Sequence, residues 1–327
     1  MRIGITYDTF DHFVWSDDHP PDADAEFEPL ETVLVLEEAL HQLGHETLRW
    51  GGPKTVAARL ARNERVDVVV NIAEGQGSRN REGFVPTLLD LYQIPFIGSD
   101  ALCLSLTLDK VLTKKVLHGS GVRCTPSWVI SPKQAQIPEG LTYPVFAKPR
   151  YEGSSMGISE ENRITCEDDL RTHVRTLTMR YKQDILIEPF LSGAEYTVGV
   201  FGHPPSASLA LQRALEETTR IGLHALERRG RPEKAYNYAI AGPIVMETEV
   251  EMQRMAVTAF ENLSCLDFAR IDFKCDDDGV PYFLEINPLP TFAPDGTFAI
   301  LAELSGQSYA DFLCGLLDQA LRRVTRP

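Results

Sequence analysis

The first 98 residues alternate between strand-like and helix-like patterns of apolar positions. Residues 66–70 form a β-branched, nearly continuous apolar run, which is typical of a strand buried in a parallel sheet. From residue 31 the apolar positions recur at helical spacing until Gly44, a natural helix stop. The order strand, helix, strand, helix, strand predicts an open parallel α/β sheet. Its expected elements are residues 1–6, 31–43, 66–70, 84–92 and 95–98.

Beyond residue 98 the pattern changes to short strands, Gly-rich loops and hairpins, which favours an α+β arrangement. The turn at residues 276–279 is a hairpin signal between two of these strands. We therefore expect α/β followed by α+β, in three small domains around one cleft, at residues 1–98, 99–189 and 190–327. Expected helices lie around Asp109-Lys110 and at 168–181 and 250–263, and expected strands at 128–130, 145–148, 184–188, 196–201, 268–274 and 282–286. Long polar loops are expected at 8–28 and 216–238.

Composition narrows the class of protein. The 327 residues are 43% hydrophobic and 24% charged, the range of soluble globular chains. A net charge of −15 argues against nucleic acid and anionic membranes as partners, and no apolar stretch approaches the roughly 18 residues of a membrane span. We expect a cytoplasmic protein. The six cysteines form no Cys-x-x-Cys pair, which favours reduced buried thiols over a zinc site.

The sharpest candidate for chemistry is a pair of motifs on the predicted hairpin. Strand alternation places Arg270 and Asp272 on one face of the first strand, and Glu285 and Asn287 on one face of the second. Carboxylate and amide oxygens with an adjacent Arg are what Mg²⁺ and a nucleotide require. The alternative is a solvated sheet face of alternating charges.

Two further segments point to nucleotide binding. Lys148 ends a predicted strand and precedes the small-residue loop 152–157, whose backbone N–H groups could approach phosphate oxygens closely. The apolar strand 184–188 ends at Glu188, and Glu195 follows, which suits adenine and ribose. Ordinary surface turns and a buried strand remain the alternatives.

Taken in order, these motifs resemble the D-alanine:D-alanine ligase branch of the ATP-grasp superfamily over roughly residues 60 to 320. The motifs that carry the resemblance are Lys110, Lys148-Pro149, Glu152-Gly153-Ser154-Ser155-x-Gly157, Leu186-Ile187-Glu188, Glu195-Tyr196-Thr197-Val198, Arg270-Ile271-Asp272 and Glu285-Ile286-Asn287. The resemblance implies a homodimer that uses ATP and Mg²⁺ and acts on small-molecule carboxylate and amine substrates. A substrate carboxylate would attack the γ-phosphate, and an amine would attack the resulting acyl phosphate to give a peptide-like amide.

The same resemblance implies a role for each matched residue. Asp272, Glu285 and Asn287 would bind Mg²⁺. Arg270 would stabilise developing negative charge, and Ser154 would lie in the loop that closes over the site. The nucleotide-binding residues would be Lys110 and Lys148 at the phosphates, Glu188, Phe190 and Leu191 at adenine, Glu195 at ribose, and Lys234 with Tyr236 or Tyr238 in a facing loop.

Departures from the family pattern concern the substrates. Where the cell-wall enzymes carry a Ser that holds the acceptor carboxylate, this chain has Gly296 with Asp295 before it. For orienting the donor amino group, Asp24, Glu26 and Glu28 are the candidates. We therefore expect an ATP-dependent, ADP-forming carboxylate–amine ligase whose acceptor is an amine other than D-alanine. The alternatives are a D-alanine:D-alanine ligase of cell-wall synthesis and a non-catalytic ATP-binding module.

Overall fold

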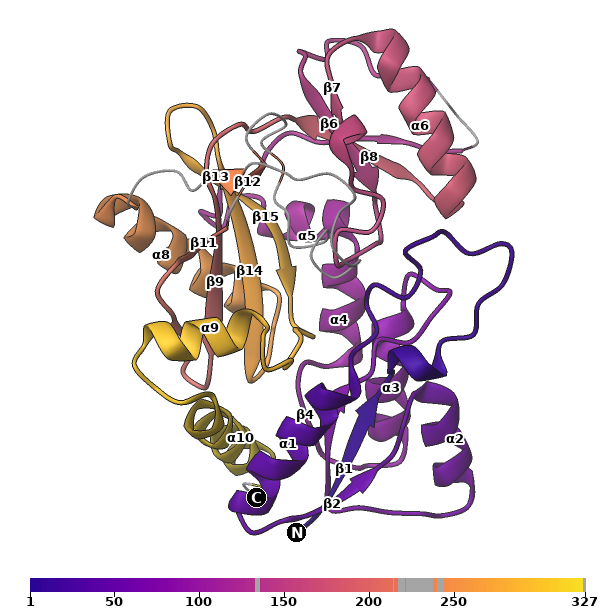
Figure 1. Cartoon of the computed structure of the whole chain (residues 1–327), viewed down its shortest axis with the longest axis vertical. Helices are drawn as coiled ribbons and strands as arrows, with labels where there is room; N and C mark the ends of the chain where they lie inside the picture. The colour runs from indigo at the N-terminus through magenta and orange to yellow at the C-terminus, as the bar shows by residue number, and fades with distance from the viewer. Residues whose placement is uncertain (133–135, 214, 217–220, 222–237, 240–243, 326–327) are drawn as a thin grey trace.

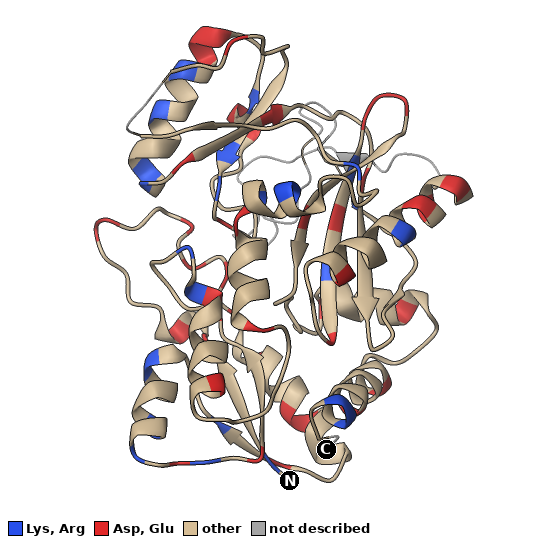
Figure 2. Ribbon diagram, turned by 180° about the vertical axis from the view of Figure 1, so that it is seen from behind, with Lys and Arg blue, Asp and Glu red and all other residues tan. Residues whose placement is uncertain are grey.

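The computed structural model describes residues 1–132, 136–213, 215–216, 221, 238–239 and 244–325. The expected loop at 216–238 lies almost wholly outside them, and so do Lys234 and Tyr236. No helix in the described ranges is long and apolar enough to span a bilayer. Figure 2 shows acidic and basic residues spread over all parts of the chain, and both signs occur on the strands of the central sheet.

The N-terminal unit contains the predicted parallel sheet, with strand order β2-β1-β3-β4 (Figure 1). Its strands are β1 (Arg2–Tyr7), β2 (Glu46–Arg49), β3 (Val68–Ile72) and β4 (Phe96–Ile97), and its helices are α1 (Leu30–Gln42), α2 (Pro53–Ala61) and α3 (Phe84–Leu91). The pattern of apolar positions did not predict β2 and α2. β2 is an edge strand with three polar residues out of four, so it has no apolar run to reveal it.

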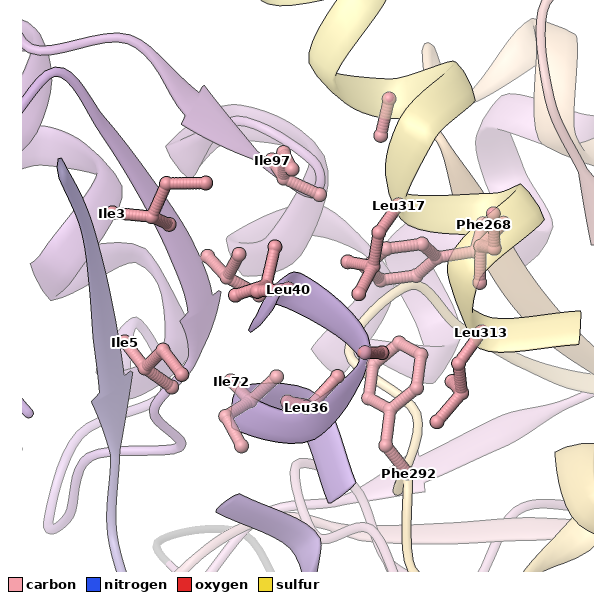
Figure 3. Packing of buried hydrophobic residues seen from close by; sticks show 14 of the residues in the cluster. Ile3, Ile5, Leu36, Leu40, Ile72, Ile97, Phe268, Phe292, Leu313 and Leu317 are labelled. Carbon is pink, nitrogen blue, oxygen red and sulfur yellow. The ribbon is translucent and has the colours of Figure 1, made fainter. Parts of the chain in front are cut away.

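The C-terminal helix α10 (Tyr309–Thr325) returns to the N-terminal unit and packs against α1. Figure 3 shows the shared core, in which Leu36 and Leu40 of α1 meet Leu313 and Leu317 of α10. Phe268 joins the same cluster. The two ends of the chain are thereby held together, and the preceding helix α9 (Thr297–Leu304) lies beside this core.

The helix expected around Asp109-Lys110 is two helices, α4 (Ala101–Leu108) and α5 (Lys110–Leu117). Asp109 caps α5, because its side chain accepts hydrogen bonds from the backbone N–H groups of Val111 and Leu112 at 3.1 Å. Arg150 fixes the same carboxylate through two bonds of 2.8 and 2.7 Å. The expectation of one continuous helix was wrong, because the Asp side chain competes for the backbone and starts a new helix.

Two antiparallel sheets form the rest of the described chain (Figure 1). The smaller has the order β5-β8-β6-β7, with strands β5 (Trp128–Ile130), β6 (Val145–Pro149), β7 (Arg163–Ile164) and β8 (Ile185–Pro189), and α6 (Glu167–Tyr181) packs against it. The larger contains β9 (Glu195–Phe201), β10 (Ser206–Ala207), β11 (Leu211–Arg213), β14 (Phe268–Cys275) and β15 (Pro281–Asn287), against which α8 (Met246–Asn262) packs. A short pair, β12 (Leu215–Glu216) and β13 (Tyr238–Ala239), completes the strands. The predicted β14–β15 hairpin is confirmed.

Candidate active site

The hairpin register brings the two predicted motifs face to face. Arg270 on β14 lies opposite Asn287 on β15, and Asp272 lies opposite Glu285. Asp272 is buried and accepts a 2.7 Å hydrogen bond from Thr197 Oγ1 on the neighbouring strand β9. Arg270 Nε donates to the same carboxylate at 3.2 Å. The alternative of a solvated sheet face is therefore wrong.

The donor set on this hairpin fits Mg²⁺. Asp272 and Glu285 line one cavity, and Glu285 and Asn287 line the adjoining one. Among the described residues, no group of three or more His, Cys, Asp or Glu side chains is placed to hold a metal, and this set has two carboxylates and one amide. Such all-oxygen donors, with room left for water and phosphate, are what Mg²⁺ takes in nucleotide sites.

Buried lysines face these carboxylates. Lys110, the first residue of α5, lies 3.4 Å from Glu285, and its Nζ also donates to the backbone carbonyl of Glu152. Burial by itself would raise the pKa of Glu285, but the charges of Lys110 and Lys148 outweigh it and hold the pKa below its ordinary value. Glu285 is therefore ionised, which is the state that metal binding would require.

Glu188, which is expected at adenine, lines the same cavity as Asp272 and lies against two buried lysines. Its carboxylate contacts Lys114, accepts a 2.7 Å bond from Thr125 Oγ1 and lies 3.3 Å from Lys148. Burial opposes ionisation, but the two lysines lower the pKa of Glu188 to about 2. Lys114 was not among the predicted site residues, although it lies one helical turn after Lys110 and therefore on the same face of α5.

Most of the expected nucleotide residues in the described ranges line one cavity between the two antiparallel sheets, whereas Lys110 lines an adjoining cavity with Glu285 and Asn287. Phe146 and Phe190 provide apolar faces, with ring centroids 6.3 Å apart. Glu195 lies 3.2 Å from Lys274, a residue that the sequence analysis missed. The cavity is lined by Thr125, Phe146, Lys148, Ser155, Ile158, Glu188, Pro189, Phe190, Leu191, Glu195, Arg213, Ile221, Asp272, Lys274, Leu284 and Glu285.

Arg213 is a further site residue that the sequence did not reveal. It lies on the short strand β11, and its Nε donates to Thr197 Oγ1 at 2.8 Å while Nη2 lies 3.4 Å from Asp272. Burial would lower its pKa, but Asp272 and Glu195 raise it, so the guanidinium stays charged. An isolated Arg in a segment without a strand pattern gives no signal in the sequence.

The Gly-rich loop after β6 reaches a second cavity, which adjoins the first at Glu285 and is lined by Glu26, Glu28 and Glu74 among others. We call this second cavity the substrate side. Ser154 and Ser155 both adopt left-handed backbone conformations, with φ of 43° and 55°. Ser154 lines the same cavity as Glu285 and Asn287. The N-terminal loop holds this segment in place, because Gly153 N–H donates to Glu26 at 2.9 Å.

The structure separates the predicted substrate residues into two groups. Glu26 and Glu28 line the substrate side, where Glu26 forms bonds of 2.6 and 2.8 Å with Arg81. Asp24 and Gly296 are not among the described residues that line these cavities, and Asp295 is exposed. Around Gly296, it is Thr291 and Thr297 that line the cavity instead, and Thr291 Oγ1 donates to Glu28 at 2.7 Å.

Comparison with known proteins identifies the family and the fold. A family model described as D-ala D-ala ligase C-terminus matches residues 125–318. D-alanine–D-alanine ligase B of Clostridium perfringens is 31% identical over 253 residues, covering 76% of this chain and 79% of that protein. Two solved structures share the fold at 18% identity: the D-alanine–D-alanine ligase of Bacillus anthracis complexed with ATP (TM-score 0.73, 98% of each chain) and the VanG D-Ala:D-Ser ligase of Enterococcus faecalis (TM-score 0.74, 98% of this chain and 99% of that one).

The fold and the site define an ATP-grasp enzyme of the carboxylate–amine ligase class. More specifically, the chain belongs to the D-alanine–D-alanine ligase family. It is an ADP-forming ligase that makes carbon–nitrogen bonds, acts on small molecules and uses ATP with Mg²⁺.

Proposed function

We propose that this ligase joins a small carboxylate to an amine other than D-alanine. The observation that carries the proposal is the acidic lining of the cavity on the substrate side, where Glu26 and Glu28 lie. The two arginines in the same lining, Arg213 and Arg270, are already directed at Asp272. A free acceptor carboxylate would meet carboxylates there, and Gly296 offers no hydroxyl to hold it.

The chain's own residues account for both chemical steps. Lys110 and Lys148 neutralise the phosphates and orient the γ-phosphate toward the substrate carboxylate. Asp272, Glu285 and Asn287 would hold Mg²⁺, which would supply charge neutralisation at the phosphoryl oxygens. Arg270 offsets the negative charge that develops when the amine attacks the acyl phosphate. The Gly-rich loop around Ser154 excludes water, which would hydrolyse that intermediate.

The test is ADP and phosphate release from ATP and Mg²⁺ with amino-acid pairs. We expect turnover with some pair and none with D-alanine alone. Asp272→Asn should abolish turnover without unfolding the protein, whereas Asp277→Asn, on the exposed turn of the same hairpin, should leave it unchanged. Absence of turnover with every pair, while ATP still binds, would contradict the proposal.

A D-alanine:D-alanine ligase is the second candidate, favoured by the name of the Clostridium perfringens relative. Turnover of D-alanine alone, at a rate comparable with the best other pair, would establish it. The homodimer implied by the family resemblance stays a prediction, which light scattering of the purified protein would test.

A further inference from the structure

Two buried glutamates, Glu74 and Glu82, lie at the inner wall of the substrate side without a bonding partner among the described residues. Glu74 follows strand β3, and Glu82 lies in the 3₁₀ turn Arg81–Gly83. Both are buried, with Glu74 9% exposed and Glu82 6% exposed. Both line the cavity that also contains Asn287 and Lys110. Within the described part of the chain, neither carboxylate forms a hydrogen bond or an ion pair.

The neighbouring carboxylates, by contrast, all have partners. Glu26 forms two bonds with Arg81 and accepts a third from Gly153 N–H. Glu152 lies 3.2 Å from Arg81 Nη2 and also bonds to Gln183. The one Arg in this cluster is therefore already shared by two carboxylates. Lys110, on the opposite side of the cavity, is paired with Glu285 at 3.4 Å.

The unpaired state of Glu74 and Glu82 is costly in the free protein. Burial, reinforced by the neighbouring glutamates, raises the pKa of Glu74 well above its ordinary value. Burial likewise raises the pKa of Glu82 to about 8, despite the nearby charge of Arg81. A cation between the two carboxylates would remove this cost, whereas an apolar or anionic ligand would increase it. A purely structural role would be served better by amides or apolar side chains of the same size.

We propose that Glu74 and Glu82 bind a positively charged side group of the substrate, an ammonium or guanidinium that is separate from the amine entering the new amide bond. This inference rests on the proposed ligase function and names its substrate class: an amino acid or amine that carries an additional cation. Because Glu82 and Glu285 line the same cavity, the cationic group would lie beside the reacting atoms and fix the substrate's orientation.

The experiment is calorimetric titration of the full chain, saturated with Mg²⁺ and a non-hydrolysable ATP analogue. Each cationic probe is paired with a neutral isostere: arginine with citrulline and lysine with norleucine, both enantiomers of each. We expect the better cationic probe to bind roughly tenfold or more tightly than its isostere, as for a desolvated ion pair. Glu74→Gln and Glu82→Gln should each lose most of that preference while keeping nucleotide affinity. Glu303→Gln, an exposed control, should keep it.

Equal affinity for each probe and its isostere, or binding of none of them, would overturn the inference. A preference that survives in both Gln variants would overturn it as well. The titration measures binding and needs no turnover. Its negative result therefore differs from a negative result for the ligase proposal, which would be the absence of ADP formation with every substrate pair. Glu74→Asp should restore part of the preference, which a general loss of folding would not allow.

Discussion

Replacing Glu82 by Gln should stabilise the protein at alkaline pH and leave it nearly unchanged at pH 5. The pKa of Glu82 is about 8 in the folded protein against an ordinary 4.5. Between these values the folded chain keeps a proton that the unfolded chain has lost, so wild-type stability falls as pH rises. Gln has nearly the same shape and carries no charge at any of these pH values.

The magnitude follows from the width of that interval. Each pH unit between the two pKa values corresponds to about 1.4 kcal/mol, so the full interval corresponds to an upper limit of about 5 kcal/mol. A chain of this length has an unfolding entropy of about 0.7 kcal/mol/K, which converts that limit to a Tm increase of about 7 °C. Removing the Glu82 charge also relieves its repulsion of Glu74, which acts in the same direction.

The assay is thermal unfolding of wild type and Glu82→Gln from pH 5 to pH 9 at constant ionic strength, without nucleotide. The two Tm profiles should nearly coincide around pH 5, diverge up to about pH 8 and keep a constant separation above it. Glu303→Gln, at an exposed position on α9, should follow wild type throughout. Parallel profiles for wild type and Glu82→Gln would refute the argument that Glu82 is buried without a partner.

Three further substitutions test other contacts of the site. Glu188→Gln leaves Lys114 buried without its carboxylate, which should cost about 3 to 5 kcal/mol and show as a lower Tm and a raised KM for ATP. Tyr181→Phe removes the hydroxyl that donates to Asp22 at 2.7 Å, so stability should fall by about 1 to 2 kcal/mol and chymotrypsin should cleave the N-terminal loop faster. Arg213→Lys keeps the charge but loses the planar fork that spans two partners, so kcat for ADP formation should fall roughly tenfold.

The sequence predicted the features that depend on local pattern. Alternation along two strands was enough to place Arg270 with Asp272, and Glu285 with Asn287, each on one face of its strand. The pairing of Asp272 with Glu285 was not predicted, because it depends on a register irregularity between Asp272 and Phe273 that has no local signal. The apolar positions of α10 also follow helical spacing, and the sequence analysis overlooked that signal. The apolar face of α10 is covered by helix α1. This contact joins segments that are far apart in the sequence, so no local pattern predicts it.

The rest of the site could not be predicted from the sequence, because contacts between distant segments bring its residues together. Arg213 comes from a three-residue strand and becomes important only because β11 pairs with β9 beside Asp272. Arg81, Glu74 and Glu82 lie in a loop whose charges resemble an ordinary polar surface. Their burial follows from the N-terminal loop folding over them, with Glu26 bonded to Arg81.

The position of charge along the cavity constrains the substrate more than the net charge of −15 does. On the nucleotide side, Lys110 is close to Glu285, which Mg²⁺ would share, and Lys148 is close to Glu188, so a polyanion is attracted there despite the acidic chain. On the substrate side, Arg81 is paired with Glu26 and Glu152. Glu74 and Glu82 are left to face the cavity. A substrate with a cation at one end and a carboxylate at the other would therefore be oriented by this gradient, carboxylate toward the phosphates and cation toward Glu74. The acidic residues at the inner wall thus select the orientation that brings the nucleophilic carboxylate to the γ-phosphate.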